Sequence, residues 1–230
     1  MFSKDFLNVL ANLGNYTDKV ILKYPVTVLN SPAQDVFINV SAESLGCQSF
    51  EPMGVYELSK LLKVFGLFEN PEVTREANLL KLQTTTESAE LALSDLELLK
   101  EYDSSKELID RLDAFPSVSE FTLTTEALKT LKSAGSILSE LNALRISGKS
   151  GNTTVDLYFH NRFNSTQNSY KREFLGTSTQ DFELKLGIEN IQKLPITEYQ
   201  VKVKFNAEKN AYRVIFVSEF FTVLIGKLSD

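Results

Sequence analysis

The residue types that most often carry catalysis are rare in this chain, which has one histidine, His160, and one cysteine, Cys47, among its 230 residues. His160 ends an apolar run that is typical of a strand, where a histidine is more often structural than a base or a ligand. One histidine and one cysteine do not supply a zinc site, and nothing indicates that they lie together as a nucleophile pair. We therefore expect no metal site and no cysteine-histidine catalysis.

Carboxylates are the remaining candidates for acid-base chemistry, as at Asp95, Glu97 and Glu101. With 30 acidic residues in the chain, such groupings arise by chance, and a solvated surface is the favoured interpretation. The chain has no glycine-rich phosphate loop, no dinucleotide-binding spacing and no Gly-x-Ser-x-Gly motif. We expect a protein that is not an enzyme and binds no cofactor. A hydrolase that uses a pair of carboxylates is an alternative, although no converging acidic pair can be identified.

Lysines, in contrast, recur at helical spacing. Lys129 and Lys132 fall on one face of a predicted helix, opposite Leu128 and Leu131. Other predicted helices repeat this pattern, and the candidate DNA-contacting residues are Lys4, Lys60, Lys63, Lys129, Lys132 and Lys193. One such face is more simply a solvated surface. Four of them in a chain of net charge -6 favour phosphate contacts that do not depend on base sequence.

Four segments carry the helical periodicity that would position these lysines: residues 4–13, about 55–65, about 125–138 and 188–194. Ser3 can cap the first helix and Gly14 can end it. The side chains expected to face inward are Phe6, Val9, Leu10, Leu13, Leu58, Leu61, Leu62, Phe65, Leu128, Leu131, Leu138, Ile188 and Ile191. Asn190 and Lys193 are expected on the opposite, polar face of the last helix.

Short runs rich in β-branched and aromatic residues predict strands between the helices. They cover residues 20–29, 36–40, 78–83, 89–93, 121–123, 143–147, 153–160, 169–175, 182–186, 199–205, 211–217 and 220–225. The order of helices and strands repeats in the second half, which predicts two similar α+β domains, residues 1–115 and 116–230. A charged connector at about 101–119 is typical of neither a helix nor a strand.

Nothing in the sequence predicts secretion or a membrane. The first residues lack the basic and apolar regions of a signal peptide, and no apolar stretch approaches the length that spans a bilayer. A single cysteine also predicts a reducing compartment. We therefore expect a cytoplasmic protein.

The order of these elements resembles the sliding clamp of T-even-type bacteriophages, which is related in fold to the cellular clamps. The resemblance covers the whole chain. It rests on Ser3-Lys4-Asp5, Tyr56-Glu57-Leu58 before Leu61-Leu62, Phe115-Pro116 before Thr125-Glu126-Ala127-Leu128, and Asn190-Ile191-Gln192-Lys193-Leu194-Pro195 before Tyr199. The order and spacing of these short motifs, more than any one of them, carry the resemblance.

The resemblance implies an α+β chain with two similar clamp domains, each with two helices packed on antiparallel sheet. Three such subunits would close a homotrimeric ring around duplex DNA, with the six lysines of the helices facing the hole. The ring would act as a processivity factor that tethers the replicative DNA polymerase, and a separate clamp loader would open it. The cell would then be an infected bacterium.

The resemblance also implies a partner pocket near the connector. The matching residues are Leu108, Ile109, Leu112, Phe115 and Pro116. An equally simple interpretation is that these residues only pack the connector against its domain. A different protein class, a monomeric α+β interaction or adaptor module without DNA binding, explains the acidic charge equally well but not the repeated helix placement.

Overall fold

The chain forms two compact units, Met1–Glu107 and Leu108–Asp230, called here the N-terminal and C-terminal units. The structure is a computed structural model that describes residues 2–102, 105–151, 154–160, 163–164 and 168–227. Thr153, expected to begin a strand, and residues 103–104 of the expected connector lie outside the described residues. The expected boundary between residues 115 and 116 stays a prediction.

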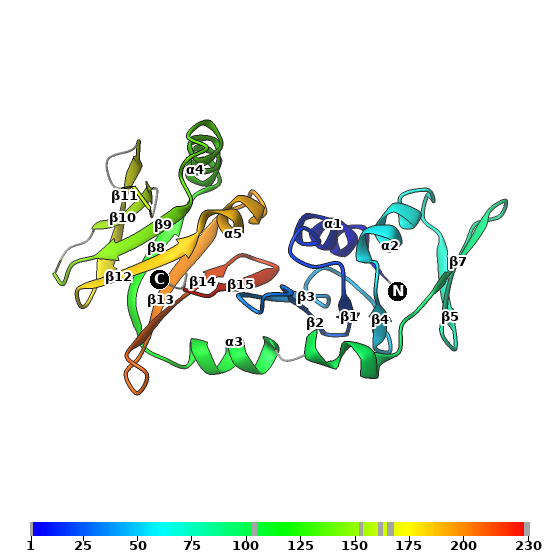
Figure 1. The fold of residues 1–230 in the computed structure, drawn as a ribbon. Helices are drawn as coiled ribbons and strands as arrows, with labels where there is room; N and C mark the ends of the chain where they lie inside the picture. Colours follow the sequence, from blue (N-terminus) through cyan, green and yellow to red (C-terminus); the bar gives the residue numbers. More distant parts are fainter. Residues whose placement is uncertain (1, 103–104, 152–153, 161–162, 165–167, 228–230) are drawn as a thin grey trace. The chain divides into compact units, whose positions relative to one another are not determined.

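Two helices of the N-terminal unit, α1 (Lys4–Leu13) and α2 (Leu58–Phe65), lie side by side on the same side of an antiparallel sheet (Figure 1). The strands of this sheet, in spatial order, are β3 (Val36–Ser41), β2 (Val26–Asn30), β1 (Val20–Leu22) and β4 (Met53–Val55). A second antiparallel sheet consists of β5 (Glu72–Glu76), β6 (Leu79–Gln83) and β7 (Ser88–Ala92).

Local signals account for α1. The Ser3 hydroxyl accepts a hydrogen bond from the Phe6 amide at 3.0 Å, and the Gly14 amide donates to the Leu10 carbonyl at 2.8 Å. Phe6, Leu10 and Leu13 are buried as expected, and Val9 is half-buried. The boundaries predicted for this helix are therefore confirmed.

Pairing between strands changes two of the predicted elements. The expected helix at 55–65 begins only at Leu58, because Val55 belongs to β4 and pairs with Val20 of β1. The expected strand at 20–29 is two strands, since the Thr27 hydroxyl bonds both the amide and the carbonyl of Lys23 and closes a turn between them. Both errors have the same cause: β1 must pair with β4 on one side and β2 on the other.

The C-terminal unit repeats the arrangement of helices on a sheet. Its sheet has the order β12 (Phe182–Gly187), β9 (Ala143–Gly148), β10 (Thr154–His160), β11 (Tyr170–Ser178), β8 (Ser117–Leu123), β13 (Tyr199–Asn206), β14 (Ala211–Val217) and β15 (Phe221–Ile225). Helices α4 (Thr125–Ile137) and α5 (Ile188–Lys193) pack against each other, and α5 also packs against β9 and β12. The Thr124 hydroxyl caps α4 by accepting from the Ala127 amide at 3.2 Å.

The connector is more ordered than expected. A 3-10 helix, η1 (Leu96–Tyr102), ends at the start of the connector, and an α-helix, α3 (Ser105–Asp113), lies within it. The expectation that it forms neither a helix nor a strand is therefore wrong. Ile109 and Leu112 are buried and three residues apart, which gives α3 a short apolar face despite its charged composition.

Candidate nucleic-acid interface

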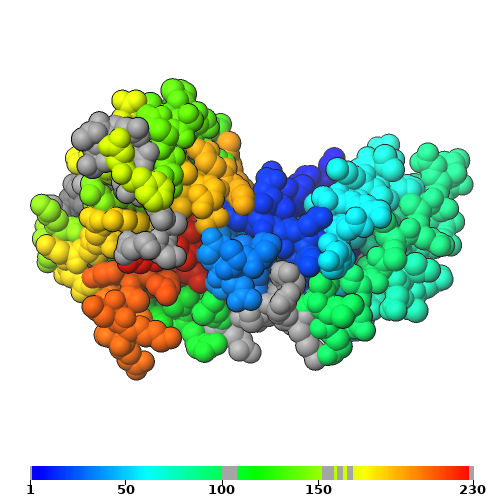
Figure 2. Space-filling view, viewed as in Figure 1, coloured from blue at the N-terminus to red at the C-terminus, as the bar shows by residue number. Residues whose placement is uncertain are grey.

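Lys4 and Lys63 lie on the helix layer of the N-terminal unit, where α1 and α2 run antiparallel. The Phe2 ring, before α1, contacts the Phe65 ring at the end of α2, with centroids 5.7 Å apart. Both lysine side chains are exposed, and neither makes a hydrogen bond or an ion pair with a described residue. Figure 2 shows α1, in dark blue, and α2, in cyan, at the surface of this unit. Both ammonium groups are therefore available to an anionic ligand.

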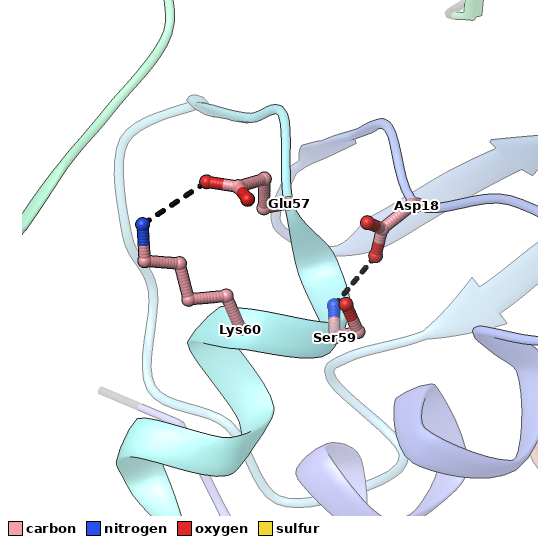
Figure 3. Close-up of polar contacts among 4 residues, drawn as sticks. All are labelled: Asp18, Glu57, Ser59 and Lys60. Atoms are coloured by element: carbon pink, nitrogen blue, oxygen red, sulfur yellow. Dashed lines mark hydrogen bonds and ion pairs between the residues drawn. The ribbon is translucent and has the colours of Figure 1, made fainter.

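Lys60 is exposed but already has a partner. Its Nζ lies 3.1 Å from Glu57 Oε2 (Figure 3), and both side chains are more than half exposed. The same view shows how the start of α2 is held: Asp18 Oδ1 accepts from the Ser59 amide at 2.7 Å. The side chain of Glu57, the residue that precedes α2, makes no hydrogen bond to the amides at the start of this helix. Because a solvated ion pair contributes little free energy, Lys60 can leave Glu57 for a phosphate.

Lys129 and Lys132, one turn apart on α4, lie in different environments. Lys129 is exposed and has no partner among the described residues. Lys132 is half-buried, and its Nζ donates a 2.7 Å hydrogen bond to the Leu194 carbonyl at the end of α5. Burial lowers the pKa of the Lys132 ammonium. The side-chain amide of Gln192 donates a 3.0 Å hydrogen bond to the Lys132 carbonyl, so Lys132 joins α4 to α5 through both its side chain and its backbone.

On α5, the face that was predicted to be polar is partly buried. Asn190 is only 6% exposed, because α5 is a short helix that packs on β9, β12 and α4 at once. The expectation that Asn190 lies on a polar surface is therefore wrong. Gly135 allows α4 to pack closely against α5, because a Cβ atom at this position would lie only 2.9 Å from Ile188 Cδ1. Lys193 is half-buried in the last turn of α5, where the helix dipole favours a cation.

The connector residues expected to form a partner pocket are not equally accessible. Ile109 and Leu112 are buried, with 5% and 9% of their surface exposed. Leu108 and Phe115 are half-buried, and Pro116 is exposed. The partner pocket stays a prediction. Two of its five expected residues, Ile109 and Leu112, are buried, as the alternative interpretation requires, in which these residues only pack the connector against its domain.

The end of α3 is anchored by a lysine of β13, Lys204. Lys204 lies beyond a β-bulge in β13, and its side chain is only 7% exposed. Its Nζ donates to the Asp113 carbonyl at 2.9 Å and lies 3.0 Å from Asp113 Oδ1. Lys202 Nζ lies 3.8 Å from the same carboxylate. In a regular strand, the alternation of polar and apolar residues along β13 would place Lys202 and Lys204 on the same face. The bulge between Val203 and Lys204 turns Lys204 inward instead, and it has no evident sequence signal.

This contact predicts an acid-sensitive anchor. The hydrogen bond from Lys204, followed by the charges of Lys204 and Lys202, lowers the pKa of Asp113 below its ordinary value of 3.8. The stabilisation is therefore complete above pH 3.8 and is lost as the pH falls through the lowered value. The melting temperature of Asp113→Asn should lie below that of the wild type at pH 7 and approach it in strong acid. Asp110→Asn, an exposed change on the same helix, should track the wild type at every pH; a constant gap for Asp113→Asn would contradict the anchor.

Of the two residue types that most often carry catalysis, only the side chain of Cys47 is described by the structure. Cys47 is buried, and its Sγ lies 3.5 Å from the Ser3 amide. The side chain of His160 lies outside the described part of the structure. Among the described residues, no three His, Cys, Asp or Glu side chains could hold a metal ion together. In the same part of the chain, no helix is both long and apolar enough to cross a bilayer.

Comparison with known proteins supplies the class of fold. No protein-family model and no curated protein sequence matches the chain. Solved structures do match. The proliferating cell nuclear antigen (PCNA) of Entamoeba histolytica superposes with a TM-score of 0.67 at 12% identity, over 98% of this chain and 95% of that one. Archaeoglobus fulgidus PCNA bound to the C-terminal region of FEN-1 gives 0.65 at 10% identity, over 97% and 95%.

A bacterial clamp matches over a smaller part of its own length. The Helicobacter pylori beta clamp bound to a DNA ligase peptide gives a TM-score of 0.63 at 12% identity, with 98% of this chain and 65% of that chain covered. The chain therefore has the fold of the DNA sliding clamps, with helices packed on antiparallel sheet in each of two units. In length it corresponds to a PCNA subunit, whereas it spans about two thirds of the bacterial clamp.

Proposed function

We propose that this chain is one subunit of a ring-shaped sliding clamp that encircles duplex DNA and tethers the replicative DNA polymerase. The observation that carries the proposal is the match to sliding clamps over nearly the whole chain. The exposed lysines on the helices of both units, in a chain of net charge -6, add an independent argument. The proposed role is binding, without catalysis.

The proposed DNA contacts are of three kinds. Lys4, Lys63 and Lys129 are exposed without a described partner and would contact phosphates directly. Lys60 would first leave Glu57. Lys132 and Lys193 are half-buried, and they would act mainly through the positive potential that they add to the helix layer. Contacts of this kind attract any duplex and leave the ring free to slide.

Two strand edges are suited to close the ring as a homotrimer. Strand β7 lies at the edge of its sheet, and β11 pairs with β8 only through Gly176–Ser178. The preceding part of β11 carries Arg172 beside the ion pair of Lys171 with Glu173, while β7 carries Glu90. Opposite charges and open edges favour pairing of β7 in one copy with β11 in the next, which would cover both edges.

The proposed partners are the polymerase and a clamp loader. The matched clamps were solved with a DNA ligase peptide and with the C-terminal region of FEN-1, which supports a tethering role. Leu108, Phe115 and Pro116 are the connector residues that a partner could reach first. We place the protein with the clamps of T-even-type bacteriophages, acting in the cytoplasm of an infected bacterial cell, on the sequence resemblance alone.

Oligomeric mass tests the ring. Sedimentation equilibrium should give three times the chain mass of 25.9 kDa. Leu175 is 85% exposed on β11, and Leu175→Asp should shift the protein to monomers because it places a charge in the proposed interface. The matched change Leu98→Asp, at a leucine 76% exposed on η1, should leave the trimer intact. A wild type that stays monomeric at high concentration would favour the adaptor module instead.

A further inference from the structure

Helix α5 depends on its neighbours for its position in the C-terminal unit. It covers six residues, Ile188–Lys193, which is fewer than two turns, and a helix of this length does not persist alone in water. Gly187, the residue before it, offers no side chain to cap its first amides. At the other end, Leu194 already has non-helical backbone angles. Contacts with other elements must therefore hold α5 in place.

Hydrogen bonds in both directions join α5 to α4, and they start and end at one residue, Lys132. Its ammonium donates to the Leu194 carbonyl at 2.7 Å, so it satisfies a carbonyl at the C-terminal end of α5. The Gln192 side-chain amide donates to the Lys132 carbonyl at 3.0 Å. Gln192 and Leu194 are the residues directly before and after Lys193. These bonds therefore restrain the chain on both sides of Lys193.

The surface of α4 is shaped to accept Gln192. A Cβ atom at Gly135 would lie only 2.5 Å from Gln192 Nε2, so a larger residue there would displace this side chain. The inward face of α5 is packed as well, since Ile191 is 1% exposed and Asn190 is 6% exposed. Packing of these two side chains sets the rotation of the short helix, and the Gln192 bond sets its distance from α4. Together they determine where the half-buried side chain of Lys193 begins.

We propose that Gln192 is a positioning residue, which together with Lys132 holds the Lys193 ammonium where it adds to the positive potential of the helix layer. The inference rests on the proposed clamp function. Lys193 attracts duplex DNA through this potential, and the attraction falls as the distance between the charges grows. Without the Gln192 bond, the end of α5 moves relative to α4, and Lys193 moves with it. Because Gln192 itself is uncharged, its effect on DNA has to pass through Lys193.

A double-variant cycle measures whether the effect passes through Lys193. Gln192→Met keeps a long unbranched side chain with a good helix propensity and removes the donor. It should lower the amount of protein retained on nicked circular DNA, after loading with a clamp loader and ATP, by about threefold, and so should Lys193→Gln. Added to Lys193→Gln, the Gln192 change should lower retention no further. A loss of the same size in both backgrounds would mean that Gln192 only stabilises the fold, which would overturn the proposal.

Ser136→Ala is the matched control, because the Ser136 hydroxyl donates to the same Lys132 carbonyl at 3.0 Å but lies on α4 itself. It should leave retention and the amide exchange of α5 unchanged, whereas Gln192→Met should accelerate that exchange. Gly135→Ala is a second way to displace the Gln192 side chain, and it should lower retention in the same Lys193-dependent manner.

The outcomes separate the positioning role from the clamp function. If the wild type is retained on circular DNA and Gln192→Met is retained equally well, the positioning role is wrong and the clamp function stands. If the wild type is not retained, the clamp function fails and the positioning role fails with it. Oligomeric mass must be the same in all variants, so that a change in retention reports on Lys193 and not on ring closure.

Discussion

Reversing the charge of Lys4, Lys63 and Lys129 together should reduce the amount of protein loaded on nicked circular DNA by about a hundredfold. These are the candidate lysines that are exposed and have no partner among the described residues, so each loses a phosphate contact without breaking an internal one. Loading is measured as co-elution of protein with circular DNA in gel filtration, with a clamp loader and ATP. Duplex with free ends should retain little wild-type protein, because a ring slides off.

A control with the same change in net charge separates position from charge. Lys149, Lys209 and Lys227 are exposed and lie outside the helices, and their combined reversal should lower loading only slightly. Oligomeric mass must be unchanged in both triple variants. If the two variants lose loading equally, the helix layer is not the DNA-contacting surface and the proposal is wrong on that point.

Replacing Lys204 with alanine should destabilise the C-terminal unit by about 2–3 kcal/mol. The change removes the hydrogen bond to the Asp113 carbonyl, the ion pair to its carboxylate and the packing of a buried lysine stem. The free energy of unfolding can be measured with urea, and exchange of the α3 amides should accelerate because this contact holds the end of that helix.

Lys202→Ala is the matched control, since it removes the same charge from the same strand. Lys202 is 30% exposed and lies 3.8 Å from the carboxylate, so its loss should cost less than about 1 kcal/mol. Equal losses for the two variants would mean that burial of Lys204 contributes nothing. Unchanged α3 exchange in Lys204→Ala would mean that the connector is held elsewhere.

Local sequence signals predicted the helix ends well where an end depends on residues that are close in the sequence. Ser3 and Gly14 delimit α1, and Thr124 caps α4, through bonds that span only three or four residues. The apolar spacing also identified the buried faces, because a helix turns by a constant angle per residue. These features could be predicted because each is decided within a few residues.

The errors arose where a distant segment competed for the same residues. Val55 joined β4 because β1 was available to pair with it, and α3 formed where its buried pair, Ile109 and Leu112, could be covered. Asn190 is buried because three elements surround α5. None of these neighbours is close in sequence, so periodicity alone could not predict their effect.

The sequence by itself determined the order of most of the main elements, the paucity of catalytic residue types and the basic faces of the helices. Only the tertiary structure decided which lysines remain available to a ligand. Lys129 is exposed, whereas Lys132 bonds to the end of α5 and Lys204 to the end of α3. Helical spacing places Lys129 and Lys132 on one face, but a lysine side chain is long enough to reach a carbonyl far away in the sequence. Whether it does so depends on the packing around it.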